Sequence, residues 1–144
     1  MKTSPAGIAF IKKAEGLRLK AYQDVAGVWT IGYGSTGAVR EGDEINEVVA
    51  TELLSTDLRM AEVAVSHAVR QPMEQYEFDA LVSFTFNLGA GALRRSTLLT
   101  LLNKGDKLGA AAEFARWHRA GGGRVTGLLI RRLREALMFL GETA

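Results

Sequence analysis

The sequence predicts a mainly helical α+β fold, with a small sheet near its N-terminus and a larger helical part after it. Three observations predict this fold. Aromatic and β-branched residues alternate with glycines between residues 17 and 40, which is typical of short strands joined by turns. Apolar residues then recur at near-helical spacing from Asn46 to about residue 68. The remaining chain, to about residue 141, reads as several helices separated by glycines and capping residues.

The first expected element is a helix at about 5–15. Ser4 followed by Pro5 is typical of a helix start, because serine caps free N–H groups and proline fits the first helical position. Gly16 ends this helix, since glycine adopts the left-handed conformation that closes many helices. Short strands follow, with a hairpin turn at 24–27. The helix expected at 46–68, capped by Asn46, would be about 30 Å long and could connect two lobes.

Further helices are expected near 75–87, 97–104, 107–119 and 126–140. Their predicted caps are Ser96, Asp106 and Thr126, and their predicted ends are Gly105 and Gly141. The chain 1–144 is thus expected to form one domain. Its parts would be a β-containing lobe at about 16–45, the connecting helix at 46–68, and a helical lobe at 72–141 together with helix 5–15.

Composition excludes several kinds of chemistry. The 144 residues contain no cysteine, so disulfides, thiolate metal sites and a cysteine nucleophile are excluded. The net charge is only +2, but from Arg94 onward ten basic residues face four acidic ones. That excess suits an anionic polymer or membrane surface, or simply reflects solvated helix faces. The apolar run near the N-terminus is too short for a signal peptide, and no run is long enough to span a membrane.

Three polar residues could carry glycosidase chemistry. Glu15 stands at the expected end of the first helix, Asp24 at the hairpin turn, and Thr30 on the returning strand. Cleavage of a glycosidic bond needs one protonated carboxyl group to protonate the leaving oxygen and one ionised carboxylate on the other side. Glu15, flanked by Ala14 and Leu17, is the candidate acid, and Asp24 in its polar turn is the candidate base. The Thr30 hydroxyl could hold the attacking water. Each residue alone also has an ordinary structural explanation, as a solvated helix end or a turn former.

Residues 15–34, EGLRLKAYQDVAGVWTIGYG, closely resemble the catalytic signature of phage-type lysozymes, glycoside hydrolase family 24. In that signature a glutamate, an aspartate and a threonine are separated by eight and five residues, as Glu15, Asp24 and Thr30 are here. The resemblance continues in FDALVSFTFNLG at 78–89, in Trp117 and in GLLIRR at 127–132. It covers about residues 8–140 and is weakest at 39–75. One departure is Ser35, where many relatives have a histidine, so a local contact could be lost.

The resemblance implies a muramidase that hydrolyses the β-1,4 bond between N-acetylmuramic acid and N-acetylglucosamine in bacterial peptidoglycan, for host lysis. It implies that Glu15 is the general acid, that Asp24 and Thr30 position the water, and that the anomeric carbon is inverted. Inverting enzymes hold their two carboxyl groups about 6.5–9.5 Å apart. The match also implies that Arg131 forms an ion pair with Glu15. Arg132 is the alternative arginine for this pairing.

Phe86 and Asn87 align with positions that line the substrate cleft, so they are substrate-binding candidates together with Arg131. Core packing or a helix-end role would explain Phe86 and Asn87 equally well. Neither a metal nor a cofactor is expected, since His67 and His118 are far apart and have no second ligand at helical spacing. The glycines at 121–123 lack the ending of a phosphate loop, and no GxSxG motif occurs, so phosphate binding and acyl transfer have no support.

Two other functions stay open. One is a lytic transglycosylase, in which a muramyl hydroxyl replaces water. The other is a non-enzymatic wall- or membrane-active protein that uses the amphipathic helix at 126–140, with Arg131, Arg132 and Arg134 beside its leucines. The setting implied by the resemblance is a phage or prophage. The protein would be a monomer made in the host cytoplasm and would reach the wall through a holin. It would bind no nucleic acid and would have no stable membrane anchor.

Overall fold

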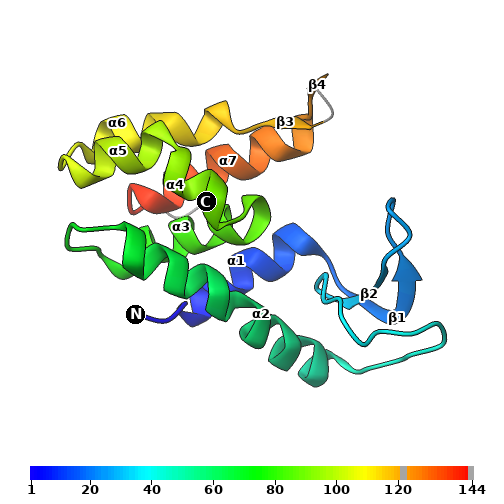
Figure 1. Ribbon diagram of the computed structural model, residues 1–144. Coiled ribbons are helices and arrows are strands. Elements are labelled where there is room, and N and C mark those ends of the chain that lie inside the picture. The colour runs from blue at the N-terminus through cyan, green and yellow to red at the C-terminus, as the bar shows by residue number, and fades with distance from the viewer. Residues whose placement is uncertain (121–122, 143–144) are drawn as a thin grey trace. The chain divides into compact units, whose positions relative to one another are not determined.

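The computed structural model describes residues 1–120 and 123–142, and it confirms the mainly helical α+β fold (Figure 1). In chain order the elements are α1 (Pro5–Glu15), β1 (Arg18–Gln23), β2 (Trp29–Gly32), α2 (Glu47–Ala68), α3 (Gln75–Leu88), α4 (Ala90–Arg95), α5 (Thr97–Asn103), α6 (Lys107–Glu113), the 3-10 turn η1 (Phe114–Arg116), β3 (Arg119–Ala120), β4 (Gly123–Arg124) and α7 (Thr126–Phe139). None of the described helices is both long and apolar enough to cross a membrane.

The chain divides into two compact units. The small unit is Ile8–Arg59, and the large unit combines Met1–Gly7 with the chain from Met60 onward. Both unit boundaries fall inside helices, one in α1 and the other in α2.

Most of the expected helix starts and ends are confirmed by hydrogen bonds. The side chains of Ser4 and Asn46 accept from N–H groups three residues later, those of Gly7 and Val49, at 3.1 and 2.9 Å. The side chains of Ser96 and Asp106 do the same at the starts of α5 and α6, at 3.1 and 2.8 Å. Gly16 ends α1 with φ 76° and donates its N–H to the Lys12 carbonyl at 2.9 Å. These short polar and glycine signals therefore determine where the helices begin and end.

The small unit is built around the antiparallel pair β1–β2. The segment before α2 runs along the other side of β1, where Ala21 N–H donates to the Asp43 carbonyl and Ile45 N–H to the Leu19 carbonyl, both at 2.9 Å. β2 ends at Gly32, where a Cβ atom would lie 3.4 Å from the Ala50 Cβ of α2. That distance is an ordinary van der Waals contact, so space alone does not require glycine; its φ of 68°, in the left-handed region, is what favours glycine here.

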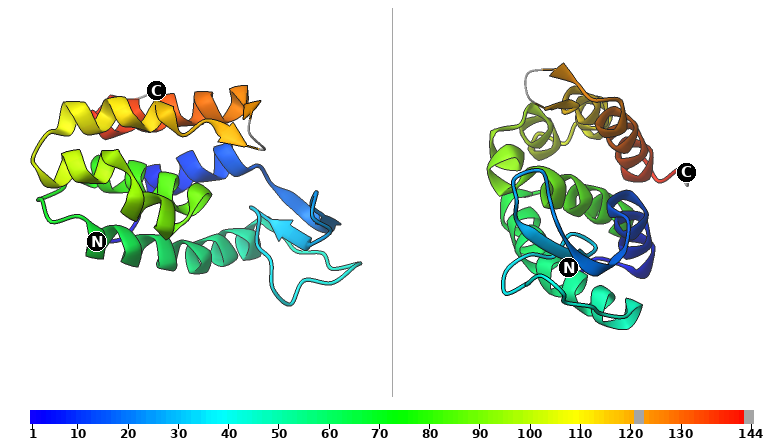
Figure 2. Two further views of the ribbon diagram at one scale, coloured as in Figure 1. Left: turned by 45° about the horizontal axis from the view of Figure 1, so that its top comes forward. Right: turned by 90° about the vertical axis from the view of Figure 1, so that its right-hand side faces the viewer.

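The large unit has α3 at its centre. Nine consecutive residues of α3, from Glu77 to Thr85, are buried, because other helices cover the helix on all sides. Phe84 of α3 meets Phe114 edge-to-face, with ring centroids 5.5 Å apart, and Phe114 in turn contacts Phe139 of α7 at 5.5 Å. α5 and α6 lie side by side on this unit, in both Figure 1 and Figure 2. Aromatic packing between α3, η1 and α7 therefore forms the core that holds this unit together.

After residue 88, the helices expected at 97–104 and 126–140 are confirmed as α5 and α7, but other expectations were wrong. The short helix α4 was missed, and the single helix expected at 107–119 ends at Glu113 and continues as the 3-10 turn η1. A hairpin β3–β4 follows, in which Arg119 pairs with Arg124. The predicted cap at Thr126 is wrong by one residue: Thr126 is the first residue of α7, and Val125 is its cap. The Val125 N–H donates to the His118 carbonyl at 2.8 Å. Gly121 and Gly122, expected in a loose turn, lie outside the described residues.

Candidate active site

Glu15 is the last residue of α1 and is half-buried. It lies beside the turn that follows β2: a Cβ atom on Gly34 would lie 3.8 Å from Glu15 Oε1, and the Lys12 ammonium lies 5.5 Å from the centre of the Tyr33 ring. The last turn of α1 therefore lies against the GYG turn of the motif. The expectation that Ala14 and Leu17 give Glu15 apolar surroundings is wrong, since both side chains are exposed to solvent.

Asp24 occupies the hairpin turn and is exposed, as the sequence predicts. Its Oδ1 accepts hydrogen bonds from the backbone N–H groups of Ala26 and Val28, both at 2.9 Å. Its own N–H donates to the Val28 carbonyl at 3.0 Å, and Gly27 N–H returns to the Asp24 carbonyl at 2.9 Å. One carboxylate oxygen thus holds the turn in place. Among the described residues no donor engages the other oxygen, Oδ2, so it can accept a hydrogen bond from a bound molecule.

Thr30 lies on β2, directly across from Tyr22 of β1, and only 4% of it is exposed. Its hydroxyl lies 2.9 Å from the Val28 carbonyl oxygen. A carbonyl has no proton to give, so the hydroxyl must be the donor in this bond. The Thr30 oxygen is therefore left as an acceptor, and its remaining lone pairs can receive a proton from water.

The backbone of Val28 connects these two residues. Its N–H donates to the Asp24 carboxylate, and its carbonyl accepts from the Thr30 hydroxyl. One residue thus orients both polar side chains. Glu15 at a helix end, Asp24 at a turn and Thr30 on a strand all lie in the small unit, and the backbone of Val28 links the last two.

Ser35, the departure from the family pattern, does make a local contact. It is buried, and its hydroxyl donates to Asp57 Oδ2 on α2 at 2.6 Å. Its backbone also exchanges two hydrogen bonds with Ile31, at 2.8 and 2.9 Å. The serine therefore anchors the turn after β2 to α2 through a charge-assisted hydrogen bond.

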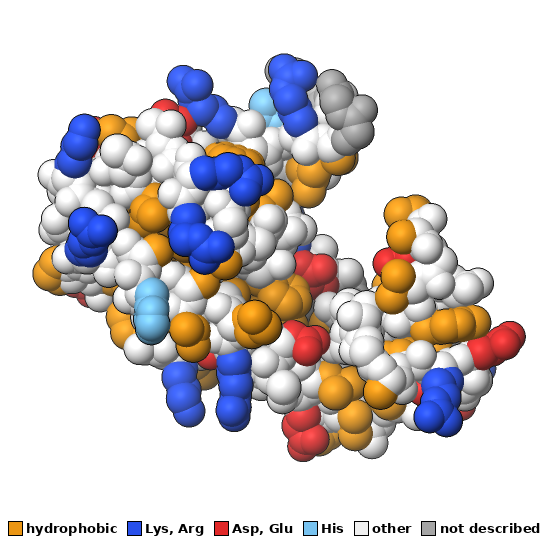
Figure 3. Space-filling model, viewed as in Figure 1, with side chains coloured by type: hydrophobic (Ala, Val, Ile, Leu, Met, Phe, Trp, Pro, Cys, Tyr) orange, Lys and Arg blue, Asp and Glu red, His pale blue; other side chains and the backbone are white. Residues whose placement is uncertain are grey.

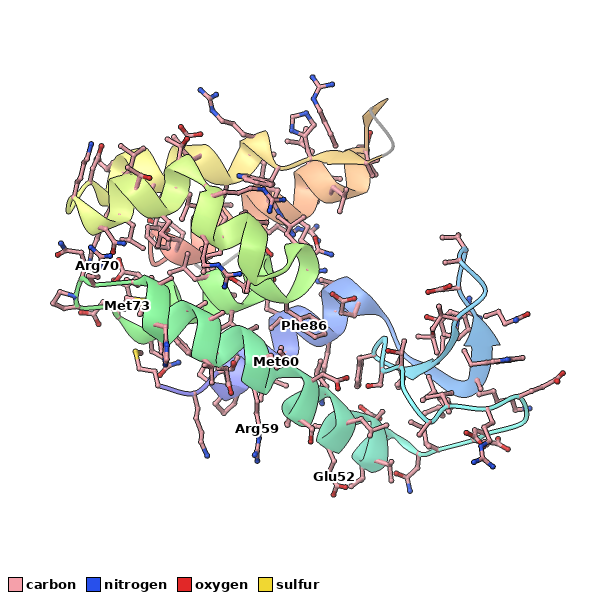
Figure 4. All side chains as sticks on the ribbon, viewed as in Figure 1. Glu52, Arg59, Met60, Arg70, Met73 and Phe86 are labelled. Carbon is pink, nitrogen blue, oxygen red and sulfur yellow. The ribbon has the colours of Figure 1, made fainter. Side chains whose placement is uncertain are left out.

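The candidate substrate residues lie in the large unit. Phe86 is half-buried in the last turn of α3 (Figure 4). Asn87 is exposed, and its side-chain oxygen accepts from Arg132 Nη2 at 2.8 Å. Arg131 donates to Glu135 Oε2 and to the Ser83 hydroxyl, at 3.3 and 3.2 Å. Substrate contacts by Phe86, Asn87 and Arg131 stay predictions, as does the expected pairing of Glu15 with Arg131.

Glu135 is the residue that the sequence interpretation missed. It is fully buried between α3 and α7, accepts from the Ser83 hydroxyl at 2.5 Å, and has Arg132 Nε 2.8 Å from its Oε1. Burial raises the pKa of Glu135 above its ordinary value, although the two nearby guanidinium groups of Arg132 and Arg131 act against this. Spacing could have revealed the network, because Glu135 follows the arginines by three and four residues on one helix.

This network changes how α7 is interpreted. Arg132 is fully buried, and the side chain of Arg131 is only 9% exposed, so neither contributes to an outer cationic face. Of the three arginines expected there, only Arg134 is exposed. The exposed leucines of α7 are thus not flanked by the cationic cluster that a membrane-active helix needs.

The two histidines occupy separate positions near helix ends. His67 is exposed in the last turn of α2, and His118 Nδ1 lies 2.6 Å from the Ala115 carbonyl oxygen, at the end of η1. No group of three possible metal-binding residues occurs among the residues that the structure describes.

Comparisons with known proteins show the family of this chain. The phage lysozyme family model matches residues 12–135. The chain is 42% identical to the endolysin of Acyrthosiphon pisum secondary endosymbiont phage 1, over 96% of this chain and 98% of that protein. It is 44% identical to the endolysin of Bacillus phage PZA, but spans only 57% of that longer protein.

Solved structures give the same result. A crystal structure of a P22 lysozyme mutant is 42% identical, has a TM-score of 0.92, and is aligned over 97% of this chain and 99% of that one. The muramidase domain of SpmX from Asticaccaulis excentricus is 40% identical, has a TM-score of 0.91, and is aligned over 96% and 97%. The chain belongs to the phage lysozyme family of glycoside hydrolases.

Proposed function

We propose that this lysozyme hydrolyses the β-1,4 bond between N-acetylmuramic acid and N-acetylglucosamine in peptidoglycan, with inversion at the anomeric carbon. Glu15 is the general acid, and Asp24 and Thr30 hold the attacking water. The motif places all three residues in the small unit. The hydrogen bonds around Val28 are the observation on which the proposal depends most.

The two acceptors define how the water is oriented. Thr30 donates its only proton to the Val28 carbonyl, and Asp24 Oδ2 is an acceptor, so each takes one proton of the same water. With both protons engaged, the water directs a lone pair at the anomeric carbon. A water held in this way reacts as an oriented nucleophile rather than as bulk solvent.

The bond changes balance with no further reactant. Glu15 gives its proton to the glycosidic oxygen as the bond from that oxygen to the anomeric carbon breaks. The water oxygen bonds to the opposite face of that carbon and loses a proton to Asp24. The products are two shorter strands, one of which ends in a reducing muramic acid. Proton exchange with solvent then restores Glu15 and Asp24 for the next cycle.

Product analysis tests this reaction on soluble, uncross-linked peptidoglycan strands. Hydrolysis adds one water and leaves a reducing muramic acid end, whereas a transglycosylase would leave an anhydro end lighter by one water. Proton NMR during the first turnovers distinguishes inversion from retention, because the β-linked substrate would first give the α-anomer. Anhydro ends, or a first product with the β configuration, would contradict the proposal.

We also propose that, in a phage-infected cell, the protein reaches the wall after a holin opens the inner membrane. Its similarity to phage endolysins that match over nearly their whole length supports this route. The test is to express the protein in a Gram-negative host with and without a holin gene. Rapid lysis only in the presence of the holin is expected, and equally rapid lysis in its absence would contradict the route.

A further inference from the structure

One face of the β1–β2 hairpin carries more than the proposed water site. Tyr22 pairs directly with Thr30 across the two strands, so their side chains leave the sheet on the same face. Asp24 follows Tyr22 by two residues and pairs with Val28, so alternation places it on that face as well. Two residues of extended strand therefore separate the Cα atoms of Tyr22 and Asp24, the proposed base, by about 7 Å.

A cation is held over this ring. The guanidinium carbon of Arg18 lies 4.6 Å from the centre of the Tyr22 ring. The strand pairing is irregular between these two residues, since Arg18 pairs with Gly32 while Tyr22 pairs with Thr30. The Arg18 side chain thus reaches forward along the strand to a ring four residues later. The stack limits the orientations of the guanidinium, so less freedom is lost when it binds a ligand.

Arg18 is exposed, and no carboxylate of the described part of the chain neutralises it. By contrast, the arginines at 116, 131 and 132 each pair with a glutamate. A guanidinium presents paired N–H donors that match the two oxygens of a carboxylate.

We propose that Arg18, held over Tyr22, binds a carboxylate of the peptide attached to muramic acid. This rests on the proposed function, because the substrate must lie along the face that carries Asp24 and Thr30. Peptidoglycan strands carry one such peptide on the lactyl group of each muramic acid, and these peptides have free carboxylates. The site would thus make the enzyme favour glycan that still carries its peptides in ionised form.

The experiment compares two forms of one substrate. Soluble, uncross-linked strands are used as they are, or after their free carboxyl groups have been converted to neutral amides with a carbodiimide and methylamine. The enzymes are wild type, Arg18→Gln and Lys20→Gln. Lys20 is the matched control, because it is an exposed cation on the same strand without an aromatic partner in the described structure.

Arg18→Gln is expected to raise KM about fivefold on native strands and to leave kcat unchanged, as loss of one exposed ion pair would do. Neutralised strands should raise the KM of wild type by a similar factor, and Arg18→Gln should add nothing further. Lys20→Gln should match wild type on both substrates. The strands contain no phosphate group. A lower KM of wild type on native than on neutralised strands therefore identifies the ligand of Arg18 as a carboxylate.

Variants of the ring test the stack. Tyr22→Phe keeps an aromatic face and should behave as wild type, whereas Tyr22→Leu should reproduce the KM of Arg18→Gln. Equal KM increases for Arg18→Gln on native and neutralised strands would overturn the proposal, as would a wild-type KM that neutralisation leaves unchanged. These outcomes differ from failure of the proposed function, in which wild type releases no reducing ends from either substrate.

Discussion

Asp24 has two roles that substitution can separate. Its Oδ1 holds the turn through the N–H groups of Ala26 and Val28, and its charge is proposed to take the proton from water. Asp24→Asn keeps an oxygen for the turn but loses the base, so kcat should fall at least about 100-fold with unchanged unfolding by urea. Asp24→Ala should lose the same activity and also about 1–2 kcal/mol of unfolding free energy.

Reducing-end release and urea unfolding measure the two effects. If Asp24→Asn keeps more than a tenth of the wild-type kcat, the carboxylate is not the base. If Asp24→Ala is as stable as wild type, the two hydrogen bonds to Oδ1 do not stabilise the turn.

Thr30 is proposed to act only as an acceptor toward water, because its proton is given to the Val28 carbonyl. Thr30→Ser keeps this hydroxyl and should retain most of the activity. Thr30→Val has nearly the same shape but no hydroxyl, so kcat should fall about 100-fold while KM stays close to that of wild type. A Thr30→Val enzyme as active as Thr30→Ser would remove Thr30 from the mechanism.

At the scale of elements, α3 and α7 are joined by a buried carboxylate. Glu135→Gln replaces one carboxylate oxygen with an amide NH2 group, which cannot accept from the guanidinium groups of Arg131 and Arg132, so a buried acceptor is lost at a cost of about 1–3 kcal/mol of unfolding free energy. Ser83→Ala removes one hydrogen bond to the same carboxylate and serves as the milder comparison, at about 1 kcal/mol. Urea unfolding at one fixed pH measures both.

The pH dependence of that loss has a definite sign. Burial holds the pKa of Glu135 above its ordinary value of 4.5, so the folded state binds this proton more tightly than the unfolded chain. The unfolding free energy gained from this tighter proton binding is fully present below the ordinary pKa of 4.5. It is lost as pH rises through the pKa of Glu135 in the folded state. The advantage of wild type over Glu135→Gln should therefore be larger near pH 4 than near pH 7. An advantage that grows with pH would mean that attraction to the arginines outweighs desolvation.

Local signals predicted the elements where local chemistry decides them. The caps at Ser96 and Asp106 and the turn after Asp24 were correct, because each depends on hydrogen bonds within a few residues. The helix expected at 107–119 was too long because no glycine or proline marks its true end. The α-helix gives way to the 3-10 turn at Phe114, and the backbone leaves helical geometry only at Trp117. The rings of Phe114 and Trp117 both pack edge-to-face on Phe84, a contact that the local sequence does not contain.

Burial of charge was the other feature that the sequence interpretation missed. Spacing suggests that Arg132 and Glu135 pair on one helix, but not that the pair is buried, since charged residues are rarely buried. Their burial depends on Ser83 and Asn87 of α3, which are about fifty residues away in the chain. The motif residues Glu15, Asp24 and Thr30, by contrast, could be located from sequence because they lie within one short segment.

At the scale of the whole molecule, charge is distributed unequally between the two units. The segment 94–119 has six basic and two acidic residues, and basic side chains predominate on the unit that contains α4–α6 (Figure 3). Such a surface would bring the protein to an anionic wall even without catalysis. Any decisive test must therefore separate cleavage of the glycan from binding to the wall.

The most direct measurement compares wild type with Glu15→Gln on Gram-negative cells whose outer membrane has been permeabilised. Turbidity is followed, and the released muropeptides are analysed for their ends. The account predicts that wild type clears the cells and releases reducing muramic acid ends, while Glu15→Gln still binds the wall but releases none. Equal clearing by both proteins, or reducing ends released equally well by Glu15→Gln, would contradict the assignment of Glu15 as the general acid.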